Sequence, residues 1–235
     1  MCKLVSSPAG DYSLAMTQTD PSPTRTRDRE TTERLILAAA REVLAEAGFQ
    51  GFGVNAVARR AGCDKQLIYR YFGGLEGLID AIGLDLGGWL QASLGDAGPR
   101  TIHPSYGALV EDWAISLMRA LRANPLVQKI VAWEIADPSP QVRRLAEARS
   151  RGMIAWVARA RGDLLPPEGM DAPAANALLI GAVQHLVLSA AAVGQFGGVP
   201  LDSDEDWARM EAALRRLVQA VYPPPGSAPV PDSNP

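Results

Sequence analysis

Apolar residues recur along this chain at the spacing of α-helices, with no strand-like alternation, and glycine and proline residues interrupt the helical periods. The first three helices are expected at 28–47, 54–61 and 65–72, and a fourth follows Gly74 and ends near Leu94. The pattern predicts five more helices, at 105–123, 125–136, 139–161, 172–195 and 204–222. We therefore expect an all-α fold.

The last two helices have apolar surfaces that are suited to pairing. In 204–222, Ser203 and Asp206 form a capping-box pattern at the start. A seam of apolar side chains follows at steps of three and four residues: Trp207, Met210, Leu214, Leu217 and Val221. The helix 172–195 is apolar nearly all round, so it must be buried from two directions. Together these helices are the best candidate for a homodimer held by a four-helix bundle.

Both ends of the chain differ in composition from the helical part. Residues 1–27 are rich in Ser, Thr, Pro and Asp without periodicity, and residues 223–235 are rich in proline. Such segments have too few apolar residues to form a core, so we expect both to be disordered.

Residues 54–72 form two short helices joined by the tight turn Ala-Gly-Cys-Asp, which is the arrangement of a helix-turn-helix. Apolar side chains that can hold the pair together are Val57, Ala58, Ile68 and Phe72. On the second helix, Lys65 and Tyr69 are four residues apart, as are Gln66 and Arg70, so all four project to one side. Lysine and glutamine can read base edges, whereas tyrosine and arginine can hold phosphates. The segment is suited to the major groove of DNA.

Several residues here also have simpler interpretations. Phe72 is expected in the core, Tyr71 is equally suited to the core or to DNA, and Tyr69 is favoured as a DNA contact. Arg59 and Arg60 are more typical of a solvated helix face than of specific contacts. Cys63 can be an oxidation switch, but a small buried apolar residue is the simpler interpretation.

Composition and charge agree with a DNA-binding head on a larger body. Of the residues, 47% are hydrophobic, enough for a sizeable core, and the whole chain carries a net charge of −3. From Arg25 to Arg70 there are nine basic and six acidic residues, so this part is weakly basic and the rest is acidic. The basic run at 25–29 can add phosphate or minor-groove contacts. Without a signal peptide or a full-length apolar span, the sequence predicts a soluble cytoplasmic protein.

The run "ILAAAREVLAEAGFQGFGVNAVARRAGCDKQLIYRYFGGLEGLIDAI" resembles the N-terminal DNA-binding domain of TetR-family transcriptional regulators. The resemblance implies a helix-turn-helix domain at 28–74 and a helical regulatory and dimerisation domain at 75–222. It also implies a homodimer on a palindromic double-stranded DNA operator, with a small-molecule effector that lowers operator affinity. The residues at the family's DNA-contacting positions are Asn55, Lys65, Gln66, Leu67, Tyr69, Arg70 and Tyr71.

The chain departs from the family pattern at two places. The family usually has a hydroxyl residue before the second helix, where this chain has Gly53 and Val54. It usually has a lysine three residues after the phenylalanine, where this chain has Leu75. Both changes remove phosphate contacts, so we expect a weaker salt dependence than in a typical relative, or compensation by the arginine-rich arm.

Aromatic, methionine and polar side chains of the second domain are candidates for lining an effector cavity, although core packing is the simpler role for each. These candidates are Trp113, Met118, Trp133, Glu134, Met153, Trp156, Gln184 and His185. Glu134 and His185 matter most because a titratable group among apolar neighbours needs a partner. If both face a cavity, the ligand is mainly hydrophobic with a polar or cationic group.

Other classes of protein find less support. The sequence has no nucleophile elbow, glycine-rich phosphate loop or paired-histidine metal motif, so we expect neither an enzyme nor a bound metal or cofactor. A helical adaptor that has lost DNA binding remains the alternative. The favoured prediction is a sequence-specific transcriptional regulator, and in particular a repressor that a mainly hydrophobic ligand releases from DNA.

Overall fold

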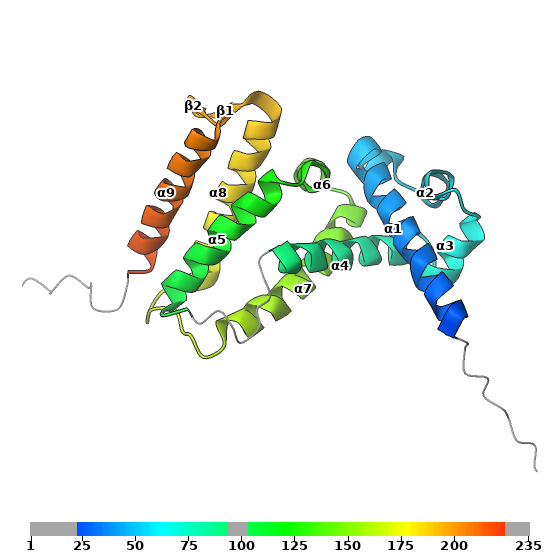
Figure 1. Cartoon of the computed structure of the whole chain (residues 1–235), viewed down its shortest axis with the longest axis horizontal. Helices are drawn as coiled ribbons and strands as arrows, with labels where there is room; N and C mark the ends of the chain where they lie inside the picture. Colours follow the sequence, from blue (N-terminus) through cyan, green and yellow to red (C-terminus); the bar gives the residue numbers. More distant parts are fainter. Residues whose placement is uncertain (1–22, 94–102, 224–235) are drawn as a thin grey trace, which may run out of the picture.

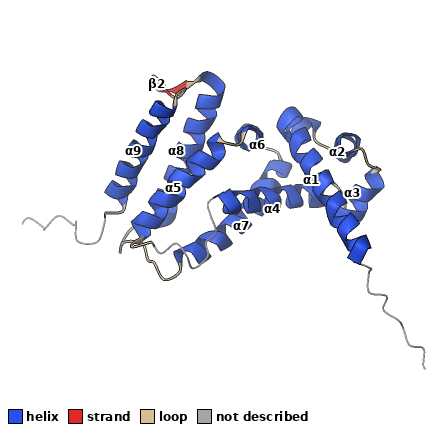
Figure 2. Ribbon diagram, in the orientation of Figure 1, coloured by secondary structure: helices blue, strands red, loops and turns tan. Residues whose placement is uncertain are grey.

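The computed structural model describes residues 23–93 and 103–223, and over these residues the chain folds into nine helices and one short hairpin (Figures 1 and 2). The helices are α1 (Pro23–Gly51), α2 (Val54–Ala61), α3 (Lys65–Phe72), α4 (Leu75–Ser93), α5 (Tyr106–Arg122), α6 (Pro125–Ala136), α7 (Pro140–Arg161), α8 (Ala172–Val193) and α9 (Asp204–Val221). The all-α fold expected from the sequence is confirmed.

Two elements differ from the sequence prediction. The first helix begins at Pro23 rather than at residue 28, and it continues to Gly51 across a kink at Gly48. A proline fits the first turn of a helix because its missing N–H has no partner there in any case. The expectation of disorder at 1–27 is therefore wrong for residues 23–27, which are helical. The other residues expected to be disordered, at 1–22 and 224–235, lie outside the described part.

The second difference is a hairpin at the end of α8, where no strand was expected. α8 ends at Val193, and β1 (Gln195–Phe196) then pairs antiparallel with β2 (Val199–Pro200). Gly197 and Gly198, both with positive φ, form the turn. Two-residue strands are too short to give an alternating pattern, which is why the sequence did not predict them.

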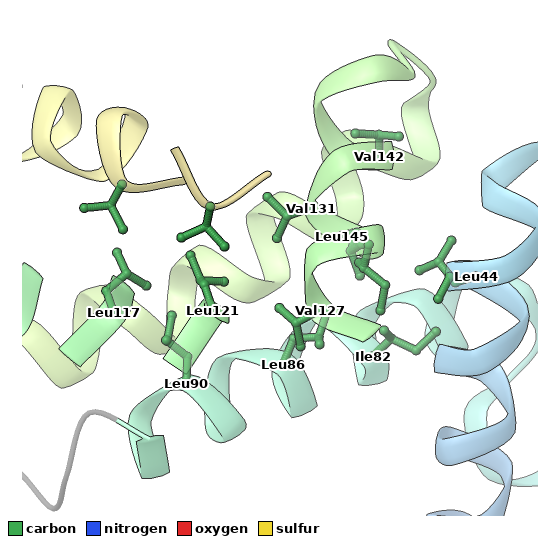
Figure 3. Packing of buried hydrophobic residues seen from close by; sticks show 14 of the residues in the cluster. Leu44, Ile82, Leu86, Leu90, Leu117, Leu121, Val127, Val131, Val142 and Leu145 are labelled. Atoms are coloured by element: carbon green, nitrogen blue, oxygen red, sulfur yellow. The ribbon is translucent and has the colours of Figure 1, made fainter. Parts of the chain in front are cut away.

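A single core runs from the first three helices into the rest of the molecule. Figure 3 shows this continuity: Leu44 of α1 lies near Ile82 of α4 and Leu145 of α7. α4 and α7 have the most extensive contact in the structure. Gly83 permits it, because a Cβ at that position would lie 2.6 Å from the Cβ of Ala148. The first three helices are therefore continuous with the rest of the fold.

Ion pairs also join α7 to α4. The Arg144 guanidinium donates to Asp80 at 2.9 and 2.6 Å and to Glu76 at 2.8 Å. At the far end of the molecule, α5 packs on both α8 and α9 (Figure 1). The predicted capping box of α9 is present, with Ser203 and Asp206 bonded to each other's backbone N–H.

Candidate DNA interface and a cavity in the second domain

The turn between α2 and α3 is built by local sequence signals. Gly62 ends α2 with φ 65°, and Gly73 ends α3 with φ 73°, a region that favours glycine. Asp64 begins α3, and its carboxylate accepts a hydrogen bond from the Gln66 N–H at 2.8 Å. These residues fix the angle at which α3 leaves the domain.

The inner faces of α2 and α3 hold the pair in the core, with α2 packed on α1 and α3 packed on α4. Val57 and Ile68 are fully buried, and Ala58 is nearly so. Phe72 is half-buried and packs against the same core, in agreement with its expected role.

The outer face carries five of the seven candidate DNA-contacting residues. They are exposed: Asn55, Lys65, Gln66, Tyr69 and Arg70. Tyr69 has 52% of its surface exposed, so an interior role for its ring is not supported. This face is the candidate DNA interface.

The other two candidates are half-buried. Leu67 and Tyr71 both pack against the core. The guanidinium carbons of Arg29 and Arg70 lie 5.5 and 5.6 Å from the centroid of the Tyr71 ring. Such cation–π contacts hold Arg29 of α1 beside α3 and restrain the side chain of Arg70.

The cations of this region fall into two groups. Lys65, Arg70 and Arg59 form no ion pair with any described residue. Arg60, by contrast, is paired with Glu42 and Glu46 of α1. Arg60 therefore joins α2 to α1, and the cations that remain available to phosphates include Lys65 and Arg70.

Both departures from the family pattern are visible in the geometry. Gly53 is the N-cap of α2 and gives it no side-chain hydrogen bond. Leu75, at the first residue of α4, is half-buried against the core rather than available to a phosphate. Beside α3, Cys63 is half-buried too, and burial together with the Asp64 carboxylate raises the pKa of its thiol. A raised pKa makes a thiol less reactive at neutral pH.

A cavity of about 510 Å³ lies among α5, α7, α8 and the segment that joins α7 to α8. Three of the candidate effector residues line it: Trp113, Met153 and Trp156. Exposed residues of its wall, including Ile154 and Arg161, connect it to solvent.

The remaining effector candidates lie elsewhere. Glu134 and Gln184 border a much smaller second hollow, where Arg149 donates two hydrogen bonds to the Glu134 carboxylate at 3.2 and 2.9 Å. Burial raises the pKa of Glu134, and the Arg149 charge opposes this increase only in part.

Three candidates have roles in packing or lie on the surface. Met118 is buried in the core, and Trp133 of α6 packs on Gly48 of α1. His185 is exposed, with its ring edge-to-face on Phe196 at 4.7 Å between centroids. None of the three lines the large cavity.

Two polar residues that line the cavity, Tyr106 and Asn176, were not predicted from the sequence. Hydrogen bonds link them to each other and to Tyr222. Asn176 donates to the Tyr106 hydroxyl at 3.0 Å and accepts from the Tyr222 hydroxyl at 2.9 Å. Burial, with the Tyr106 and Asp171 charges, raises the pKa of Tyr222 to about 12. The sequence signal that could have indicated this cluster is Asn176, the one amide in the otherwise apolar first half of α8.

A broad apolar face of α8 and α9 lies uncovered. Leu178 of α8 is 77% exposed and Leu217 of α9 is 58% exposed. Of the sequence-predicted seam, Trp207 and Leu214 are buried against the chain's own core, whereas Leu217 is not. Among the described residues, α8 is also the one helix with the length and apolar composition to cross a membrane.

Comparisons with known proteins agree with this architecture. Residues 36–82 match the family model for bacterial regulatory proteins of the tetR family. No match was found among curated protein sequences.

Solved structures share the fold of most of the chain. A TetR-family transcription regulator from Marinobacter aquaeolei VT8 is 20% identical, with a TM-score of 0.59, over 84% of this chain and 98% of that one. The transcriptional regulator FadR from Bacillus subtilis, in complex with stearoyl-CoA, is 17% identical, with a TM-score of 0.57, over 79% of this chain and 96% of that one. The multidrug binding protein EbrR, complexed with imidazole, is 19% identical, with a TM-score of 0.52, over 83% of this chain and 97% of that one.

The fold and the exposed α3 define a helix-turn-helix DNA-binding regulator with a helical second domain. Residues 36–82 match the N-terminal segment of TetR-family regulators, and over most of its length the chain shares the fold of solved TetR-family transcription regulators.

Proposed function

We propose that this protein is a transcriptional repressor that binds a palindromic operator as a homodimer and leaves it when a small molecule occupies the second domain. One observation carries the proposal: α3 presents Lys65, Gln66 and Arg70 to solvent while its inner face is fixed in the core. A rigid helix with exposed polar tips is what a major-groove reader requires.

Within this proposal the side chains of α3 have separate tasks. Lys65 and Gln66, in the first turn, read base edges. Tyr69 and Arg70, one turn later, hold phosphates and set the register of the helix in the groove. Asn55, at the start of α2, reaches the neighbouring backbone. Leu67 and Tyr71 act mainly by packing, and Tyr71 also keeps Arg29 and Arg70 close to the duplex.

A homodimer would pair the uncovered faces of α8 and α9 from two subunits. Small residues on the exposed side of α8, such as Ala177, Gly181 and Ala182, allow close approach of helices. Bundles of this kind form when two helices from each subunit exclude water from a shared apolar seam. The two α3 helices would then meet half-sites separated by about one helical turn, or a multiple of it.

Effector binding is supported by the 510 Å³ cavity, a volume within the usual range for small-molecule sites. Two proteins of the same fold are recorded with small molecules, one with stearoyl-CoA and one with imidazole. Helix α7 lines the cavity and also packs along α4, whose first turns adjoin α3. A ligand that moves α7 relative to α4 would shift the angle of α3 and favour the state with low DNA affinity.

The test is selection of bound sites from random duplex DNA, followed by electrophoretic shift at several salt concentrations. The expected result is one palindromic motif, bound far more tightly than unrelated DNA. Failure to enrich any motif would favour the alternative of a helical adaptor without DNA binding. Such a regulator would work in the cytoplasm, where the chromosome is accessible.

A further inference from the structure

We propose that the cavity among α5, α7 and α8 binds an apolar molecule that carries a carboxylate, with Arg161 as its counter-ion. The inference rests on the proposed function only in calling that molecule the effector. Its chemical class follows from the wall of the cavity itself.

The charge of the wall has one sign. Among the described residues that line the cavity, Arg161 is the one that carries a charge, and none is Asp or Glu. Arg161 forms no ion pair with a described residue, so its guanidinium is available to a ligand. A guanidinium binds a carboxylate through two parallel hydrogen bonds. No acidic side chain among the described lining residues competes with a ligand carboxylate for Arg161.

The polar groups of the wall are also mostly donors. The indole nitrogens of Trp113 and Trp156 are buried and have no hydrogen-bond partner. Trp156 as a whole is 7% exposed. Both nitrogens lie behind the accessible surface of the wall, and an indole N–H is a donor only, so neither ring adds an acceptor to the cavity. The two indoles come from different helices, α5 and α7, on either side of the cavity.

The side-chain hydrogen-bond acceptors of Asn176 and Tyr106 in the wall already have donors within the protein. The amide oxygen of Asn176 accepts from Tyr222, and its nitrogen donates to the Tyr106 oxygen. The Tyr106 hydroxyl therefore has its proton to give. With the Arg161 cation and the Tyr106 hydroxyl as donors, and no carboxylate among the described lining residues, the wall matches a ligand rich in acceptors.

This chemistry replaces the cationic ligand group considered from the sequence. That expectation depended on Glu134, which lies at the smaller hollow and is held there by Arg149. An ammonium ligand in the large cavity would meet Arg161 and no opposite charge. Burial of such a charge without a partner is unfavourable.

The experiment uses the full-length protein and three probes with the same decyl chain: decanoate, decanol and decyltrimethylammonium, each below its micelle concentration. Binding is followed by calorimetry and by tryptophan fluorescence, since Trp113 and Trp156 line the cavity. Decanoate should bind at least about tenfold more tightly than either other probe, as expected for a charge-assisted pair.

Variants locate the effect. Arg161→Gln should weaken decanoate about tenfold and leave decanol unchanged. The matched control is Arg159→Gln, which changes a nearby exposed arginine of α7 that does not line the cavity. Ala158→Trp should fill the rim of the cavity and abolish binding of all three probes.

Several results would overturn the proposal. They are no binding of any decyl probe, equal or tighter binding of decanol or the ammonium, and an Arg161→Gln variant that retains the preference for the acid. Release of operator DNA is measured separately. If decanoate binds as described but does not release DNA, the ligand class holds and the proposed effector role fails.

Discussion

The indole ring of Trp133 lies directly against the backbone of Gly48: a Cβ on Gly48 would be 2.8 Å from ring atoms Cδ2 and Cε2. This contact joins α6 of the second domain to the end of α1 in the DNA-binding head. Gly48 has φ 61° and ψ −171°, a combination that almost only glycine adopts. Both the backbone conformation and the ring above it require a residue without a side chain.

Gly48→Ala should therefore destabilise the protein by two mechanisms at once. Backbone strain in this region contributes about 1–3 kcal/mol, and the contact with Trp133 adds to it. The free energy of unfolding is measured in urea. The control is Gly162→Ala, because Gly162 also has a positive φ outside the left-handed helical region (φ 51°, ψ −125°) and no atom within 4 Å of its would-be Cβ. Equal losses in the two variants would show that the Trp133 contact contributes nothing.

The relation between Gly48 and Trp133 also shows what the sequence could and could not predict. Helical periodicity and the glycine stops predicted each helix of the described residues, because these signals are local. The sequence left a cavity role for Trp133 open beside the simpler one of core packing, since a tryptophan among apolar residues has the same pattern in a cavity wall and at a junction between helices. Only the packing of α6 on α1 distinguishes the two.

The DNA interface and the cavity differ in the same way. Lys65, Gln66, Tyr69 and Arg70 could be placed on one face from spacing alone, because they lie within one short helix. The cavity takes its wall from three helices and a connecting segment, so no single pattern marks it. Trp113, Met153 and Trp156 were found by residue type, whereas the hydrogen bonds of Asn176 depend on how α8 meets α5.

Substitutions in α3 should separate base reading from phosphate contact. Lys65→Ala together with Gln66→Ala should reduce the discrimination between the selected operator and altered sites, because base contacts carry specificity. Tyr69→Phe removes one neutral hydroxyl and should weaken binding to all sequences about equally, without changing the salt dependence. Arg70→Ala should lower the slope of log affinity against log salt by about one for each α3 in the complex.

Shift assays at four salt concentrations, on operator and scrambled duplexes, give all of these quantities. Arg159→Gln, on α7, is the control for loss of an exposed cation outside the interface. If the double alanine variant keeps its sequence preference, Lys65 and Gln66 are not the readers.

A charge on the uncovered face of α8 should prevent dimer formation. Leu178→Glu places a carboxylate where a second α8–α9 pair would exclude water, and burying it unpaired costs several kcal/mol. Sedimentation equilibrium should then show a monomer where the unchanged protein shows a dimer. Leu165→Glu is the matched control, since Leu165 is 74% exposed and lies outside α8 and α9. A dimer that survives Leu178→Glu would place the subunit contact on another face.

The ion pair of Glu134 and Arg149 gives a prediction that depends on pH. The Glu134 side chain is 7% exposed, so removing its cation leaves a buried charge. Arg149→Met keeps most of the arginine's apolar stem and should cost about 3 kcal/mol of unfolding free energy at pH 7. Adding Glu134→Gln should recover much of that loss, because the buried charge is then absent.

The direction with pH follows from the raised pKa of Glu134. A carboxyl whose pKa is higher in the folded protein than in the unfolded chain stabilises the fold fully below its ordinary value near 4.5, and this stability is lost as pH rises through the raised value. Arg149→Met should raise that pKa further, so its cost should shrink between pH 7 and pH 5 as Glu134 takes up a proton. Urea unfolding of the two single variants and the double variant at both pH values measures the coupling. A cost that is the same at both pH values, or additive losses in the double variant, would mean that Glu134 and Arg149 do not stabilise one another.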